Sequence, residues 1–219
     1  MKNYLILATL LLAASMQSCY PEGPEYVSDM DIAMTTYDTS ADFSKYSTYS
    51  LPDTVIYFDN NSKAVLGAKF DSLILNLVEE QFNALGYTKV TPSDVTQPAA
   101  IVTISAYSQD NYGYYTNNWY DYWGWYWGSL WPGYTFSPFY GWDPYGYDYY
   151  VYEDGAIIID MIDNTKFYKG EGSNSRTLNI LWKGIVNGII SGNSNQLMNR
   201  ISNEVEQCFN QSPYLDINK

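Results

Sequence analysis

Residues 155–162 read GAIIIDMI, and residues 177–186 read TLNILWKGIV. Both runs are short and rich in apolar, mainly β-branched residues, which is typical of buried strands. Asp163 and Asn164 form a turn signal after the first run, so the second run is predicted to return as its antiparallel partner. The two runs therefore predict an antiparallel pair of strands.

The other elements follow from hydrophobic periodicity. Further strands are predicted at 27–37, 46–51 and 99–106. A helix is predicted at 63–85, with Gly86 to end it, and a second at 194–209. The order of these elements predicts an α+β fold, a mostly antiparallel sheet with two helices packed on one face. One domain is expected at 27–212, followed by a C-terminal tail at 213–219.

A long aromatic-rich insertion separates two of the strands. Residues 107–152 are dominated by Tyr, Trp, Gly, Asp and Asn, and no Lys or Arg occurs between Lys89 and Lys166. No period of two or of 3.6 residues persists there, so irregular structure is predicted.

Charge and composition exclude several functions. The chain has 11 Lys and Arg against 24 Asp and Glu, a formal net charge of −13, which would repel nucleic acids. It has no histidine, which removes Ser-His and Cys-His catalysis and imidazole metal sites. We expect no nucleic-acid partner, no cofactor and no enzymatic activity.

The N-terminus has the layout of an export signal. Lys2, an apolar run from Tyr4 to Ala14 and Ser18-Cys19 match the regions of a secretory leader that ends at residue 18. A small residue directly before cysteine looks like a bacterial lipobox, which predicts lipidation of Cys19 and a membrane partner for its acyl chains. Residues 19–26 are expected to be an extended tether. The alternative is ordinary cleavage that leaves a free thiol.

Few other residues have a chemical signature. Cys208 shares helical spacing with Leu197, Ile201 and Val205, which predicts a place in the core. Asp160 and Asp163 lie at i and i+3 on a strand and should diverge, so Asp160 is interpreted as an outward-facing residue and Asp163 as a turn former. Glu153 and Asp154 could join other acidic residues in a calcium site, but the chain has no Asp-x-Asp-x-Asp-Gly loop of the kind that binds calcium.

With these elements in place, the chain resembles a family of Gram-negative lipoproteins known as domain of unknown function 4136. The matching pieces are residues 42–49, 85–87, 155–163 and 181–184, followed by the terminal helix. The resemblance implies an outer-membrane lipoprotein with an α+β domain. It implies no established activity, substrate or catalytic residue.

The aromatic insertion leaves three interpretations open. Its tryptophans could contact an envelope protein or a membrane interface, stack against a glycan, or pack within a loop that binds nothing. A carboxylate-dependent hydrolase is the weakest alternative. We expect a non-catalytic envelope interaction or assembly module whose contact surface contains Trp119, Trp123, Trp125, Trp127, Trp131 and Trp142.

Overall fold

The computed structural model describes residues 32–57, 67–91, 97–107, 156–165, 179–187 and 193–219. The predicted leader and tether lie outside these ranges, as does all of the aromatic insertion beyond Tyr107. All described elements belong to one compact unit, Asp31–Lys219.

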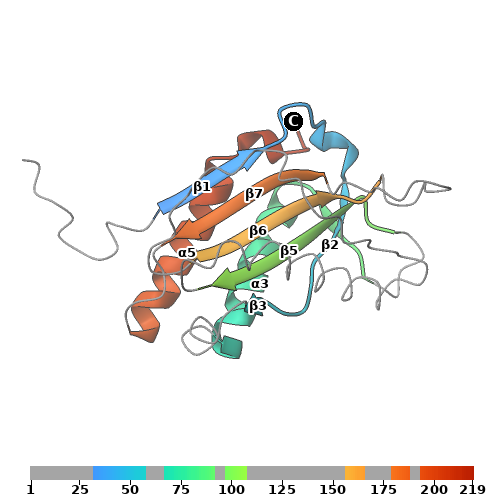
Figure 1. Cartoon of the computed structure of the whole chain (residues 1–219). Coiled ribbons are helices and arrows are strands. Elements are labelled where there is room, and N and C mark those ends of the chain that lie inside the picture. Colours follow the sequence, from blue (N-terminus) through green and yellow to red (C-terminus); the bar gives the residue numbers. More distant parts are fainter. Residues whose placement is uncertain (1–31, 58–66, 92–96, 108–155, 166–178, 188–192) are drawn as a thin grey trace, which may run out of the picture. The chain divides into compact units, whose positions relative to one another are not determined.

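A seven-stranded sheet forms the centre of this unit, with the strand order β1-β7-β6-β5-β2-β4 and β3 paired to β5 (Figure 1). The four longer strands pair in antiparallel fashion: β1 (Ile32–Tyr37), β7 (Ile180–Asn187), β6 (Ala156–Asp163) and β5 (Ala100–Tyr107). The three short strands pair in parallel: β2 (Thr48–Ser50), β3 (Ile56–Tyr57) and β4 (Thr88–Lys89).

The sheet is therefore mixed: its four longer strands are antiparallel, as predicted, and the three short strands add parallel pairs that the prediction did not contain. The predicted pairing of residues 155–162 with the run that ends at Val186 is confirmed, with Ile157 opposite Val186. The parallel pairs arise because a helix separates β2 from β4 and β5, and such a crossover returns the chain in the same direction. Strands of two residues, such as β3 and β4, carry no periodicity by which a sequence could reveal them.

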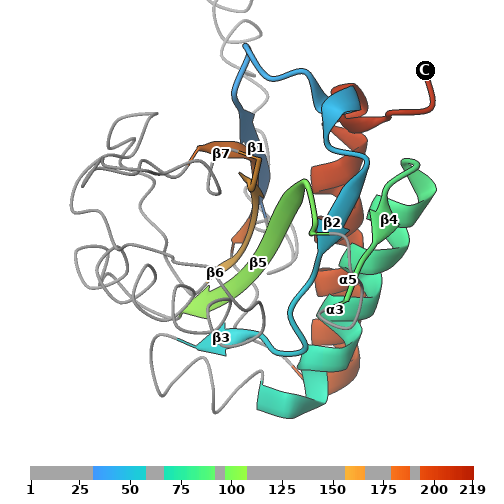
Figure 2. The ribbon, with the colours of Figure 1, turned by 90° about the vertical axis from the view of Figure 1, so that its right-hand side faces the viewer.

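Two helices pack against each other and lie on the same side of the sheet (Figure 2). The first, α3 (Gly67–Ala84), buries a stripe at every fourth position that consists of Phe70, Ile74, Val78 and Phe82. It ends before Gly86, whose φ of +94° is a conformation that favours glycine.

The second helix, α5 (Ser194–Asn210), agrees closely with the predicted 194–209. Its N-terminus carries a capping box, in which the Asn193 side chain accepts from the backbone N–H groups of Asn195 and Gln196. Beyond α5, the chain forms a short 3-10 helix, η3 (Pro213–Leu215), and Leu215 is fully buried. A second 3-10 helix, η2 (Phe43–Lys45), precedes β2.

The hydrophobic core lies between the sheet and the helices, with Trp182 of β7 at its centre. The indole ring packs 5.0 Å from Phe209 and edge-on to Phe82, measured between ring centroids. Its N–H donates to the Ser212 hydroxyl over 2.8 Å, so the buried polar atom is satisfied. Gly184 leaves room for this ring, because a Cβ there would lie 2.7 Å from it.

The central strand β6 is also buried on the opposite face of the sheet. All eight residues of β6 are buried, although successive strand residues point to opposite faces. Ile157, Ile159 and Met161 join the cluster between sheet and helices, whereas Ile158 and Ile162 do not. Strand β6 is therefore buried on both faces, and we refer to the face of the sheet away from α3 and α5 as the second face.

Candidate functional site

The residues predicted to carry function lie outside the described part of the chain. Cys19, the predicted lipidation site, falls in residues 1–31. All six tryptophans of the predicted contact surface fall in residues 108–155. The candidate chemistry that the structure does describe consists of the carboxylates of β6, a polar cluster on α3 and Cys208.

The two carboxylates of β6 do not form a shared site. Asp163 accepts hydrogen bonds from the backbone N–H of Thr165, over 2.8 Å, and from its hydroxyl, over 2.6 Å. This is a turn stabilised by an aspartate side chain, so the turn-forming role is confirmed. Burial and the nearby Asp163 carboxylate raise the pKa of Tyr46, so this hydroxyl stays protonated.

Asp160 is buried, with 1% of its surface exposed, so its interpretation as an outward-facing residue was wrong. Its Oδ1 lies 3.6 Å from Nζ of Lys183, whose side chain is 18% exposed. The two residues are register partners on β6 and β7, and Thr103 is the partner of Asp160 on β5. A buried carboxylate next to an ammonium group costs desolvation energy that their attraction offsets only in part, so the removal of one partner is more damaging than the removal of both.

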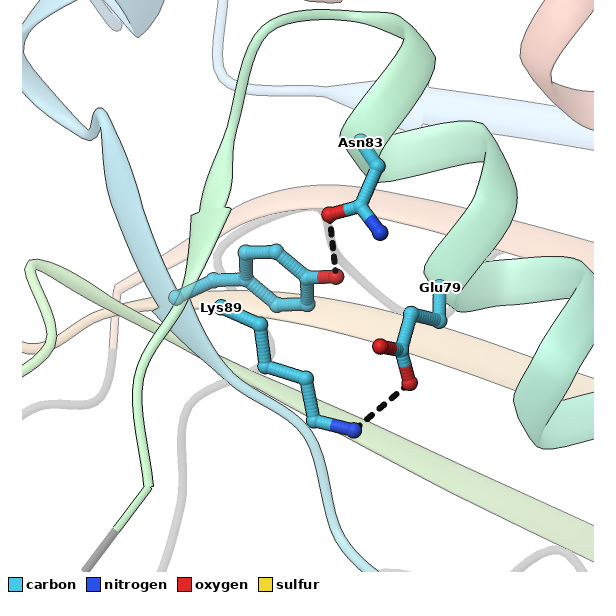
Figure 3. Close-up of polar contacts among 4 residues, drawn as sticks. Glu79, Asn83 and Lys89 are labelled. Atoms are coloured by element: carbon cyan, nitrogen blue, oxygen red, sulfur yellow. Dashed lines mark hydrogen bonds and ion pairs between the residues drawn. The ribbon is translucent and has the colours of Figure 1, made fainter.

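A second polar cluster connects α3 to the short parallel strands. Lys89 of β4 donates to Oε2 of Glu79 over 2.6 Å, and Asn83 lies one turn further along the same helix (Figure 3). The Tyr49 hydroxyl donates to Oδ1 of Asn83 over 3.3 Å. Burial, and to a lesser extent the charge of Glu79, raise the pKa of Tyr49, so it remains a donor. These contacts hold β2 and β4 against the helix.

Cys208 lies in the core, as predicted. It is fully buried and free, and it belongs to the same cluster as Leu197, Ile201 and Val205. Its Sγ lies 3.6 Å from the carbonyl oxygen of Ile185. Burial raises the pKa of this thiol to about 12, which suppresses the nucleophilic thiolate form.

We therefore expect Cys208 to react with a thiol reagent more than tenfold more slowly in the native protein than in denaturant at pH 8. The raised pKa and the burial act in the same direction, since one removes thiolate and the other blocks access. The rate of modification would be measured from the colour that Ellman's reagent releases, in a variant in which Cys19 is replaced by serine so that Cys208 is the one remaining thiol. Rapid modification of the native protein would contradict the burial of α5.

The described residues show no arrangement for metal chemistry or membrane spanning. Within these ranges, no three His, Cys, Asp or Glu side chains lie close enough to hold a metal ion. None of the helices described is both long enough and apolar enough to cross a membrane.

The order of elements from β1 to η3 corresponds to a known domain. The family model for a domain of unknown function, DUF4136, matches residues 33–214. The chain belongs to the DUF4136 family. This match covers the sheet, both helices and the residues that carry the resemblance in the sequence.

The comparison with solved structures finds the fold of this DUF4136 chain in another member of the family. The crystal structure of a DUF4136 family protein, BT2437, from Bacteroides thetaiotaomicron VPI-5482 is 24% identical, with a TM-score of 0.55. The PelC dodecamer from Paraburkholderia phytofirmans is 7% identical, with a TM-score of 0.38. In both cases the alignment covers 85% of this chain and 98% of the other. No curated protein matches the sequence.

Proposed function

We propose that this DUF4136 protein is an outer-membrane lipoprotein, anchored by acyl chains on Cys19, whose domain is a non-catalytic interaction or assembly module of the cell envelope. The observation that carries the proposal is Ser18-Cys19 at the end of the apolar leader. The buried state of Cys208 supports it, because the chain has two cysteines and the second is free and enclosed in the core. Cys19 therefore has no disulfide partner within the folded chain.

The length of the tether supports a position close to the membrane. Twelve residues, 20–31, separate Cys19 from the first residue of β1. At no more than about 3.5 Å per residue, they span at most about 40 Å. An acylated Cys19 would thus keep the domain within reach of partners at the membrane surface, and the aromatic segment would supply the contact surface.

The direct test of the anchor is the mass of the mature N-terminal peptide. We expect protein extracted from membranes by detergent to begin at Cys19 and to carry the added mass of a diacylglyceryl group and an amide-linked acyl chain. A mature chain that begins at another residue, or an unmodified Cys19, would contradict the lipoprotein proposal.

The interaction role requires a separate test. Chemical crosslinking in intact envelopes should join the wild-type protein to a protein partner that is lost when Trp123, Trp125 and Trp127 are replaced by serine. An unchanged thermal unfolding transition of this variant would show that the domain is still folded and that only the contact surface has been altered. Retention of the same partner by the folded variant would contradict the contact surface, and binding to purified envelope polysaccharide instead would favour a glycan-binding module.

A further inference from the structure

Strand β1 forms one edge of the sheet. It stands first in the order β1-β7-β6-β5-β2-β4, and among the described strands it pairs with β7 alone (Figure 1). None of its six residues is buried, whereas six of the eight residues of β7 are. Since the edge of a sheet presents a row of backbone N–H and C=O groups, a further strand can pair with β1 on its outer side.

The backbone groups that point away from β7 are those of Ala33, Thr35 and Tyr37. The N–H of Asp38 donates to the carbonyl oxygen of Leu181 over 2.9 Å, and these two residues face each other one step beyond the last register pair of β1 and β7. Inward and outward residues alternate along an antiparallel strand, so every second residue before Asp38 also bonds to β7. The three residues between them therefore direct their N–H and C=O groups to the open side.

Hydrogen bonds within the described ranges leave this outer row nearly empty. The exposed side chain of Gln211 donates through Nε2 to the carbonyl oxygen of Ala33 over 3.3 Å, which agrees with an outward direction for that oxygen. A carbonyl oxygen has two lone pairs, so it can still accept a second bond. No described group bonds to the N–H of Ala33, Thr35 or Tyr37, or to the carbonyl oxygen of Thr35 or Tyr37.

The features that usually keep an edge strand from pairing are absent from β1. Its sequence, IAMTTY, contains no charged residue, no proline and no glycine. Its register with β7 runs from Ile32 to Tyr37 without a bulge. Ile32 is 50% exposed and is the exposed large hydrophobic residue of the described ranges. The strand thus offers a neutral, regular edge about 20 Å long.

The outward residues of β1 match those of a second copy of the same strand. In an antiparallel pair centred on Thr35, this residue faces its own counterpart, and Ala33 of each copy faces Tyr37 of the other. Each of the three facing pairs exchanges two backbone hydrogen bonds, which satisfies the outward groups of both strands. A small side chain then lies opposite each large ring, and a threonine pair is favourable across strands. Asp38 faces Ile32, so no two carboxylates lie opposite each other.

The same pairing suits the side-chain faces of β1. Ala33 and Tyr37 pack against the core cluster between the sheet and the helices, and the Tyr37 ring stacks 3.8 Å from that of Tyr214. Facing residues of paired strands share a face, so the helices of both copies would lie on one side of a continuous sheet. Helix α5 packs against β1 and β7, and it would therefore lie close to its counterpart across the seam.

We propose that the chain forms a two-fold dimer in which β1 pairs with β1 of a second copy and joins the two sheets into one. The dimer gives the proposed assembly role a specific partner and rests on that role for its biological setting. Since Ile32 faces Asp38 of the other copy, the two strands begin about 20 Å apart along the seam. Two tethers that span up to about 40 Å can then reach the same membrane.

The first test introduces one thiol on β1 in a Cys19→Ser background, in which Cys208 stays buried. Thr35→Cys places two cysteines opposite each other with a Cα separation of about 5.5 Å, which a disulfide can bridge. Ile32→Cys is the control, because it is an exposed position whose two copies lie about 20 Å apart in this register. Under mild oxidation, the linked dimer of Thr35→Cys should form at least tenfold faster than that of Ile32→Cys. Equal or faster linkage of Ile32→Cys would overturn the proposal.

Sedimentation equilibrium of the Cys19→Ser chain measures the dimer without a covalent link. Thr35→Pro removes an outward N–H and no bond to β7, and proline is tolerated on an edge strand where its nitrogen faces outward. We expect this change to raise the dimer Kd at least tenfold while the domain still unfolds cooperatively. A chain that is monomeric up to about 100 µM, or a folded Thr35→Pro chain that dimerises equally well, would contradict the dimer. If Thr35→Pro fails to fold, the pair of cysteine variants still decides the question.

Salt and the intact envelope separate self-association from other partners. Two copies with a net charge of −13 repel each other, so the dimer Kd should fall severalfold between about 0.05 and 0.5 M salt. A dimer that weakens with salt would be held by charge pairs that this register does not contain, which would refute it. Linkage of Thr35→Cys to a different protein in envelopes, in a chain that keeps Cys19, would assign the edge to that protein instead. A monomeric Cys19→Ser chain would leave the lipoprotein proposal standing, and an unmodified Cys19 would leave the dimer standing.

Discussion

Replacing Cys19 with serine is expected to move essentially all of the protein from the membrane fraction to the soluble fraction. A serine hydroxyl does not provide the thiolate that accepts the diacylglyceryl group, so no acyl chain would be attached. Each buried methylene contributes about 0.8 kcal/mol to membrane binding, and several chains on one residue make an anchor that withstands washing. Without them, a net charge of −13 would oppose binding to anionic lipid.

The measurement is fractionation of cells after a high-salt wash, with incorporation of a labelled fatty acid as a second readout. Cys208→Ala is the matched control, because it removes the other thiol of the chain and should leave both readouts unchanged. If Cys19→Ser stays in the washed membrane fraction, the protein is held there by something other than acyl chains on Cys19.

The sequence predicts best the elements whose patterns are local. The helix α5 begins at the predicted Ser194, because the apolar positions repeat with helical period and Asn193 caps the first turn. Strands β5 and β6 also fall within a residue or two of their predicted bounds, since each is a short apolar run.

The parts that could not be predicted depend on contacts between distant residues. The parallel pairing of β2 with β5 brings Tyr49 opposite Ala100, and nothing within either segment specifies that partner. Likewise, the pairing of Asp160 with Lys183 depends on the register of β6 and β7, which includes an irregularity at Met161 and Ile162.

The burial of Asp160 could have been predicted from the sequence around it, although the alternation of faces along a strand suggests an outward-facing residue. Residues 156–162 are apolar at six of seven positions, and such a continuous run indicates a strand that is covered on both faces. On such a strand a lone carboxylate requires a partner. Each central residue of the motif at 181–184 has a structural contact. Trp182 packs in the core between the sheet and the helices, Lys183 pairs with Asp160, and Gly184 leaves room for the indole ring. These described contacts assign the motif a structural role.

The charge pair on the second face gives the largest expected effect on stability. Lys183→Met should lower the free energy of unfolding by about 3 kcal/mol, since it removes the ammonium group whose Nζ lies 3.6 Å from a carboxylate that is 1% exposed. The value lies at the lower end of the range for buried pairs, because the lysine side chain is 18% exposed. Urea unfolding followed by circular dichroism would measure it.

The double variant Asp160→Asn with Lys183→Met separates the charge pair from simple packing. Removal of both charges should restore at least half of the loss, because the asparagine retains hydrogen-bonding capacity and no buried ion remains. The control is Lys89→Met at the ion pair with Glu79, whose side chains are 30% and 35% exposed and whose loss should cost less than about 1 kcal/mol. Two pairs of the same chemistry thus differ in expected effect because they differ in burial. Equal losses at Lys183 and Lys89, or a double variant that is destabilised by the sum of its single changes, would show that Asp160 and Lys183 are not energetically coupled.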